Sequence, residues 1–300
     1  MRISTTHYQN QAVSSILETQ GTLAKLQEQA STGRRVNRPS DDPLAAAEVE
    51  RLRAGQARND IEKRMMSYAK NQMALSENSL GAGIDILQRA RDLMINARNG
   101  AMTDIEHAVL GSQLQQLRSE LLDLANTKNN EGDYVFGGQG SEQAPFSPSG
   151  DPVFQGMPGT RQNGFDTPLD LTLNGDQVFT GFGPGGNRTI FQELDAVAEA
   201  LGAGDRAALE EALTRGMMVA DNALERFSVT RSLLGEQRLA IDARENLLAS
   251  GDLGAAQRRS ELVDTDYASV LSGIQSRDLA LRAAMQTYSQ ISQLSMFNYL

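Results

Sequence analysis

The chain has 300 residues, a formal net charge of -10 and no cysteine. The acidic balance argues against a nucleic-acid partner, which would need a basic face to neutralise phosphates. The lack of cysteine excludes disulfides, thiolate nucleophiles and cysteine metal ligands. No apolar run is long enough to cross a bilayer, so we expect no membrane insertion, and residues 1–20 lack the apolar core of a cleavable signal sequence.

The first predicted element is a helix near the start of the chain. Its apolar seam alternates steps of three and four residues through Ile16, Thr19, Leu23, Leu26 and Ala30. A seam that repeats every 3.5 residues favours helices wrapped around each other rather than around a broad core. An aromatic content of only 5% is consistent with rods held together by aliphatic stripes.

A long helix is predicted over residues 43–99, beginning at a proline suited to the first helical position. Asp41 and Asp42 precede it, and both are interpreted as cap acceptors. Gly81 and Gly83 are expected to weaken this helix by about 1 kcal/mol each relative to alanine.

The next helix is predicted to open with a capping box formed by Thr103 and Glu106. In such a box each side chain accepts a hydrogen bond from the backbone amide of the other residue. Its seam residues are Leu110, Leu114, Leu117, Leu121 and Leu124.

Residues 131–189 are predicted to form a small β-rich insert that projects to the surface and leans on the helices. Six of the eight prolines and six of the nine phenylalanines lie there. A strand is predicted at residues 134–136. A hairpin is predicted from two apolar segments, residues 171–173 and 177–179, which flank Asn174 and Gly175.

Helices are predicted again after the insert. One begins at about Ile190 and ends before the break at residues 202–204, and Asp205 caps the next. That helix keeps heptad stepping, with Arg231 and Arg238 at its seam. The last helix has its seam at Tyr267, Val270, Ile274, Leu281, Ala284, Tyr288 and Ile291, with one gap at Arg277.

Four patterns could carry chemistry, and each has a simpler structural interpretation. Residues 181–186 satisfy G-x-G-x-x-G, but no strand follows to complete a nucleotide-binding unit, which favours a turn-rich loop. His7 and His107 are interpreted as surface helix residues rather than metal ligands or general bases. Asp41 and Asp42 are better explained as caps than as a metal or catalytic pair.

The fourth pattern is a basic patch in an acidic chain, formed by Arg34, Arg35 and Arg38. It is either a solvated loop or a cluster that docks carboxylates of a neighbouring subunit. No catalytic, cofactor-binding or metal site is predicted.

Several segments resemble the family of flagellins and flagellar hook-associated proteins. Residues 31–43 read STGRRVNRPSDDP and are similar to its hallmark loop, with Gly33, Arg34, Asn37, Pro39, Asp41, Asp42 and Pro43 as the matching residues. Residues 263–268, VDTDYA, resemble its carboxy-terminal aspartate-tyrosine signature. The start MRIS, residues 132–138 (GDYVFGG) and residues 291–300 (ISQLSMFNYL) are similar to the branch that forms the hook–filament junction.

The resemblance implies a structural subunit of the bacterial flagellum and not an enzyme. It implies a homo-oligomeric ring with hook-associated protein 1 on the proximal side and flagellin on the distal side. The subunit would be exported unfolded by the flagellar type III apparatus, without a cleaved signal peptide, to the extracellular flagellum. A cytoplasmic export chaperone would hold the carboxy-terminal helix. No cofactor is implied.

The resemblance also supplies the fold class: mainly α, with a long antiparallel coiled coil or helical bundle formed by the two ends of the chain and a central β-rich domain. Residues 1–42 with 263–300 would form the terminal coiled-coil assembly domain, 43–130 with 190–262 a helical rod, and 131–189 the insert. The expected assembly residues are Ile16, Leu23, Leu26, Tyr267, Val270, Ile274, Leu281, Tyr288, Ile291, Leu294 and Leu300.

Three alternatives stay open. Flagellin itself resembles the chain at both ends, although its loop usually reads Asn-Ser-Ala where this chain has Asn37, Arg38 and Pro39. The insert could be a carbohydrate- or surface-binding module, because its phenylalanine and tyrosine content exceeds what a small hairpin needs. The whole chain could also be a cytosolic coiled-coil scaffold.

Overall fold

The structure is a computed structural model that describes residues 2–140, 142–147, 153–163 and 169–297. Most of these residues are helical, as predicted. The helices are α1 (Arg2–Thr32), α2 (Pro43–Ala97), α3 (Asp104–Ala125), α4 (Gly175–Phe179), α5 (Ile190–Ala203), α6 (Arg206–Val263) and α7 (Tyr267–Phe297). None of the described helices is both long enough and apolar enough to cross a membrane.

The chain forms two compact units. The terminal unit contains residues 1–60 and 248–300, and the central unit contains residues 61–247. Helices α2 and α6 therefore contribute residues to both. The three-part division made from the sequence stays a prediction.

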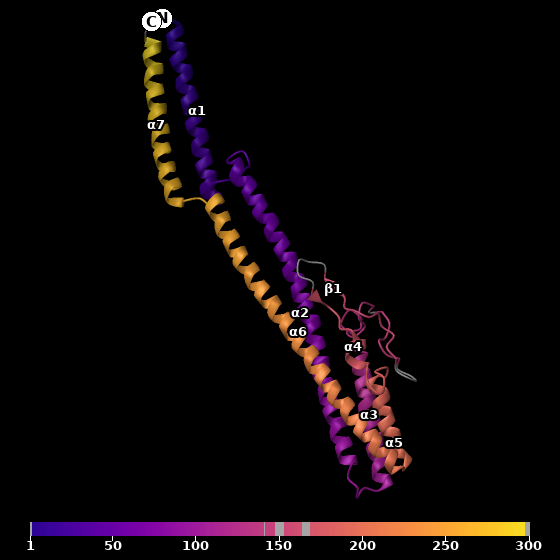
Figure 1. Cartoon of the computed structure of the whole chain (residues 1–300). Helices are drawn as coiled ribbons and strands as arrows, with labels where there is room; N and C mark the ends of the chain where they lie inside the picture. The colour runs from indigo at the N-terminus through magenta and orange to yellow at the C-terminus, as the bar shows by residue number, and fades with distance from the viewer. Residues whose placement is uncertain (1, 141, 148–152, 164–168, 298–300) are drawn as a thin grey trace. The chain divides into compact units, whose positions relative to one another are not determined.

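In the terminal unit, α1 and α7 pack side by side and antiparallel, with the two chain ends at the same end of the pair (Figure 1). The predicted seam of α1 is half-buried at all five positions, from Ile16 to Ala30. Leu26 faces α7 at Gly273, where an added Cβ would lie 3.3 Å from Leu26 Cδ1. The prediction that the two ends of the chain pair as helices is confirmed.

In the central unit, α2 and α6 run side by side and are linked by a series of ion pairs. They join Glu62 to Arg244 at 2.7 Å, Lys70 to Asp242 at 2.7 Å, Glu77 to Arg238 at 2.6 Å and Arg91 to Asp221 at 2.7 Å. Because these pairs are partly exposed, each contributes little to stability, but together they favour one register of the two helices.

The two arginines at the predicted seam of α6 have a partner on α2. Glu77 accepts from Arg238 at 2.6 Å and lies 3.5 Å from Arg231. One carboxylate therefore serves both seam arginines, so they do not interrupt the pairing of α2 with α6.

Gly83 of α2 creates space for an aromatic ring. A Cβ at Gly83 would lie 2.4 Å from Cε1 of Phe227, a fully buried residue of α6, whereas the nearest atom to a Cβ at Gly81 is 3.9 Å away. From the sequence, both glycines were predicted to be weak points in the helix. The structure separates them, because only residue 83 must remain small.

Capping fixes the start of several helices. The predicted box of Thr103 and Glu106 opens α3, and an unpredicted box of Thr189 and Gln192 opens α5. The predicted break after α5 is also present, because Gly204 ends that helix with φ 72°.

The predicted hairpin is wrong. Asn174 does not turn between two strands; its side chain accepts a hydrogen bond from the Asp176 amide and caps the short helix α4. Residues 134–136 do not form the predicted strand: Tyr134 makes an isolated bridge to Lys128, and the carbonyls of Val135 and Phe136 each accept one hydrogen bond, from the amides of Leu173 and Gly175. Among the described residues, extended pairing is limited to two-residue strands, β1 (Gln162–Asn163) and β2 (Leu169–Asp170), so no β-rich domain is seen.

The reason is that apolar residues flanking an Asn-Gly pair do not distinguish strand from helix over so short a segment. Here tertiary packing decides. Phe179 of α4 is fully buried and meets Phe227 of α6 edge to face, with ring centroids 5.2 Å apart. Phe136 and Phe146 lie against Phe179 at 5.1 and 5.4 Å.

This aromatic cluster contains three of the six phenylalanines of the insert, Phe136, Phe146 and Phe179. Phe191 of α5 adds a fifth ring, 5.2 Å from Phe146. The rings lie in the core between insert and helices and not on a surface that could receive a ligand, and aromatic pairs of this kind stabilise a core beyond their buried area. The insert therefore packs on the helices as predicted, through a core that the strand assignment did not foresee.

His107 is not a surface residue: it is buried, and its Nε2 lies 3.1 Å from the carbonyl oxygen of Ala97 at the end of α2. Residues 181–186 form a turn closed by paired backbone hydrogen bonds between Phe182 and Arg188. Helix α4, not a strand, precedes this turn, which agrees with the interpretation as a loop.

Candidate assembly site

Two segments that the sequence analysis singled out separately lie together in the terminal unit. The loop after α1 pairs with the segment between α6 and α7 through backbone hydrogen bonds. The amide of Arg35 donates to Val263 O at 2.7 Å, and the amide of Thr265 donates to Gly33 O at 3.0 Å. We call residues 33–42 with 262–267 the joint.

Gly33 is required at the joint for two reasons. Its φ of 69° lies in the left-handed region, where a side chain is strained. A Cβ there would also lie 2.8 Å from the hydroxyl oxygen of Tyr267, the first residue of α7. The glycine of the hallmark loop and the tyrosine of the aspartate-tyrosine signature are therefore neighbours.

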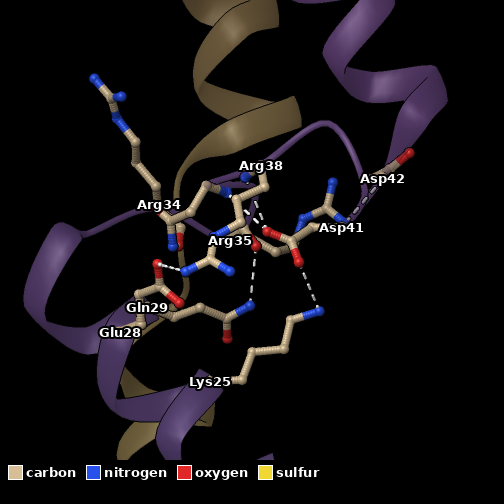
Figure 2. A network of polar contacts seen from close by, with 9 residues as sticks. Lys25, Glu28, Gln29, Arg34, Arg35, Arg38, Asp41 and Asp42 are labelled. Carbon is tan, nitrogen blue, oxygen red and sulfur yellow. Dashed lines mark hydrogen bonds and ion pairs between the residues drawn. The ribbon is translucent and has the colours of Figure 1, made fainter.

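Arg35 ties the loop to the end of α6 and to the start of α2. Its Nη2 donates to Leu262 O at 2.7 Å, and its Nη1 lies 3.3 Å from Asp42 Oδ2 (Figure 2). The last carbonyls of a helix have no hydrogen-bond partner within the helix. At the carboxy-terminal end of α6, the guanidinium of Arg35 supplies that partner for one of them.

Asp42 is the N-cap of α2, as predicted. Its Oδ1 accepts a hydrogen bond from the Ala45 amide at 3.0 Å, and Pro43 is the first residue of the helix. This backbone hydrogen bond is the main cause that lowers the pKa of Asp42, and the Arg35 guanidinium lowers it further.

Asp41 is not a cap, so that part of the prediction is wrong. Its Oδ2 accepts from the amides of Asn37 and Arg38 at 3.2 and 3.0 Å, and its Oδ1 pairs with Lys25 Nζ at 3.0 Å. The hydrogen bond from Lys25 is the largest cause of the lowered pKa of Asp41. Asp41 thus folds the loop back on α1 instead of starting α2.

The loop closes as a turn around Pro39. The amide of Asp41 donates to Arg38 O at 2.9 Å, and proline suits the second position of such a turn. Asn37 Nδ2 donates to Arg34 O at 3.2 Å. The hallmark residues are therefore largely the residues that give the loop its shape.

Helix α1 supplies three contacts that sequence reasoning missed. Besides Lys25, Gln29 Nε2 donates to Arg35 O at 2.9 Å, and Glu28 Oε1 lies 3.4 Å from Arg38 Nη2 (Figure 2). These residues are three and four apart, so they share one face of the last turns of α1. That spacing is a usable signal, but the sequence does not say what the face meets.

The predicted assembly residues differ in burial. Val270 is buried, Tyr267 is 52% exposed, and the others with described side chains are half-buried: Ile16, Leu23, Leu26, Ile274, Leu281 and Tyr288. Ile291 and Leu294 belong to α7, but their side chains lie outside the described part, as does Leu300.

Both aspartates of the loop already accept hydrogen bonds from backbone amides and form ion pairs with Lys25 or Arg35. The arrangement therefore fits a structural joint rather than a metal-binding or catalytic pair. Among the described residues, no group of three histidines and carboxylates could hold a metal ion. The fold and this joint define a class of protein: a helical structural subunit whose first and last helices pair. The joint links the loop after α1 to the segment before α7 through hydrogen bonds.

Comparison with known proteins identifies the family. Residues 3–141 match the bacterial flagellin N-terminal helical region. Flagellar hook-associated protein 3 of Escherichia coli is 30% identical over 99% of this chain and 99% of its own length. A structure of a putative flagellar hook-associated protein from Vibrio parahaemolyticus has the same fold, with a TM-score of 0.70 at 17% identity over 75% of this chain and all of that one.

The chain belongs to the flagellar hook-associated protein 3 family, the hook–filament junction proteins of the extracellular bacterial flagellum. It is a structural protein and not an enzyme. The flagellin alternative has less support, because flagellin A of Vibrio cholerae is 28% identical over only 48% of this chain and 39% of its own length.

Proposed function

We propose that the chain assembles as a ring of identical subunits at the distal end of the hook, with hook-associated protein 1 on its proximal side and flagellin on its distal side. The paired ends, α1 and α7, are the assembly surfaces of this ring, and residues 131–189 with their supporting helices face outward. The observation that supports this role most directly is the incomplete burial of the terminal seam.

The seam of the terminal unit is too exposed for a finished core. Six of the predicted assembly residues are half-buried although both helices are present. Outside the seam, Leu17 is 62% exposed and Leu279 is 70% exposed. Each fully buried leucine would contribute about 1.5–3 kcal/mol, so further copies packed on this unit would gain substantially from covering such residues.

The same physics supports export of the chain in an unfolded state. A single helix with a narrow apolar seam is marginal in water without a partner. We expect the apolar stripe from Ile274 to Leu300 to be covered by a chaperone in the cytoplasm and by other subunits after export.

Electron microscopy of hook ends tests the junction role. A strain that lacks this protein should carry hooks without filaments and should release flagellin to the medium, and expression of the wild-type chain should restore filaments. Filaments of normal number in the deletion strain would contradict the proposal.

The cytosolic-scaffold alternative makes the opposite prediction for location. The chain should be found in the culture medium of a filament-less cell and should disappear from it when flagellar export is blocked. Retention in the cytoplasm of export-competent cells would favour the scaffold.

A further inference from the structure

The charged side chains of the loop are paired within the chain, with one exception. Lys25 pairs with Asp41, Glu28 with Arg38, and Arg35 with Asp42. The guanidinium of Arg34 has no hydrogen-bond or ion-pair partner among the residues that the structure describes, and Figure 2 shows it pointing away from the others. The three loop arginines, equivalent in the sequence, therefore differ in the fold.

The backbone that carries Arg34 is held in place. Its amide donates to Thr32 Oγ1 at 3.3 Å, its carbonyl accepts from Asn37 Nδ2 at 3.2 Å, and the residue forms an isolated bridge to Asp264 in the other segment of the joint. When a mobile surface arginine binds a partner, its main chain and its side chain both lose conformational entropy. The main chain of Arg34 is already ordered by folding, so binding would order only its side chain.

The two aspartates in the segment that faces the loop, Asp264 and Asp266, are engaged elsewhere. Asp264 Oδ2 accepts from Ser260 Oγ at 2.5 Å, and Asp266 Oδ1 accepts from the Ala268 amide at the start of α7. Neither carboxylate pairs with Arg34, although both lie in the segment that contacts the loop.

The first turns of α7, which meet the loop at the residue before Arg34, expose an aromatic and an apolar side chain. Tyr267, 52% exposed, lies beside Gly33, and Leu271, 53% exposed, is one turn further along α7. Arginine and tyrosine are enriched where proteins meet, and they contribute most when an apolar neighbour excludes water.

We propose that Arg34 binds a carboxylate on a second copy of this chain, with Tyr267 and Leu271 packed at the edge of the contact. A second copy fits because the chain has 38 acidic and 28 basic residues, so identical copies repel unless cations are placed where they meet. A guanidinium suits this role, since it can donate two parallel hydrogen bonds to one carboxylate. The inference rests on the proposed ring and names one of its contacts.

The first test compares Arg34→Glu and Arg34→Ala with Arg53→Ala in the deletion strain. Arg53 is a matched control in the same unit, because its partner Glu50 is on its own helix. We expect both Arg34 variants to keep the thermal midpoint of the purified chain. The glutamate variant should reduce the number of hooks that carry filaments by about tenfold, as expected when one charge-assisted contact is lost, and Arg53→Ala should match wild type.

The second test identifies the partner. Because the chain has no cysteine, Arg34→Cys provides a unique site for a thiol-linked photoreactive benzophenone. The variant is expressed beside the wild-type chain, and isolated flagella are labelled and irradiated. We expect a cross-linked product of two copies of this chain, joined to a peptide that contains aspartate or glutamate.

The outcomes separate this inference from the proposed function. If wild type fails to restore filaments, the junction role is wrong. If wild type and Arg34→Glu restore filaments equally, or if position 34 cross-links only to another flagellar protein or to none, the junction role stands and the Arg34 contact is wrong.

Discussion

The hydroxyl of Tyr267 lies where a side chain at residue 33 would begin, since a Cβ on Gly33 would be 2.8 Å from that oxygen. This relationship connects two segments more than two hundred positions apart in the sequence. It couples the start of α7 to the loop that follows α1, so a change on either side should disturb the pairing of the chain ends.

Replacing Gly33 with alanine should destabilise the joint. The substitution places a Cβ both in the left-handed region and against Tyr267, and a left-handed non-glycine residue alone costs about 1–2 kcal/mol. Amide hydrogen exchange at residues 33–42 and 263–267 should show faster opening.

Gly21→Ala is the matched control for this change. Gly21 is inside α1, and nothing lies within 4 Å of an added Cβ. Alanine there should stabilise the helix by about 0.5–1 kcal/mol. Equal protection of the joint in Gly33→Ala and wild type would contradict the steric role of Gly33.

The two loop aspartates should respond differently to alanine. Asp42→Ala removes the cap of α2, so exchange should increase in the first turn after Pro43. Asp41→Ala removes the link to Lys25, so exchange should increase in residues 37–41 while the first turn of α2 stays protected. Both variants should impair filament assembly more than folding of the monomer, and an unchanged assembly yield would mean that the loop only separates two helices.

Acid should open the same joint. The pKa values of Asp41 and Asp42 are lowered in the folded chain, by Lys25 and by the Ala45 amide as the respective main causes. A lowered folded-state pKa means that the stabilisation is complete above the unfolded value of about 3.9 and is lost as the pH falls through the folded-state value. Exchange in the loop should therefore be constant from neutral pH to about pH 5 after correction for intrinsic rates, and should rise below about pH 4.

Two glycines of α2 should give opposite results in the central unit. Gly83→Ala forces a Cβ to 2.4 Å from the Phe227 ring and should cost about 1–3 kcal/mol through overpacking. Gly81→Ala meets nothing closer than 3.9 Å and should stabilise the helix by about 1 kcal/mol. Urea denaturation of the purified chain measures both, and a shift of the same sign in the two variants would contradict the packing.

Glu193 should be the carboxylate whose loss costs most in the central unit. Its side chain is 1% exposed and lies 3.0 Å from Arg188 and 3.1 Å from Arg215. Glu193→Gln removes the charge but keeps the shape; because Arg188 and Arg215 remain partly exposed, the loss should be smaller than the about 3–5 kcal/mol of a fully buried pair. In contrast, Glu211→Gln affects a side chain that is 79% exposed and should change stability by no more than about 0.5 kcal/mol.

Deletion of residues 292–300 should separate folding from assembly. The central unit does not include this segment, so the purified variant should keep the urea midpoint of residues 61–247. Hooks in a strain that expresses only this variant should carry no filaments. Normal motility would contradict the role of the terminal pair in assembly.

The sequence by itself determined the helices and much of their capping. Heptad spacing at Ile16–Ala30 and at Val270–Tyr288, and the capping box at Thr103, depend on residues three or four apart, whose geometry a helix fixes locally. The hallmark loop and the ending added the family by resemblance. The neighbouring aspartates were equivalent at this level, because both are good cap acceptors.

Only the tertiary structure decided which of these equivalent residues does what. Asp41 pairs with Lys25 while Asp42 caps α2, Gly83 makes room for Phe227 while Gly81 does not, and Asn174 caps α4 instead of turning a hairpin. The choice between equivalent residues follows from contacts between separate segments, such as Asp41 with Lys25, Gly83 with Phe227, and Phe179 of α4 with Phe227. Local pattern carries no information about such a contact, since the free energy that selects it comes from burial and pairing across the fold.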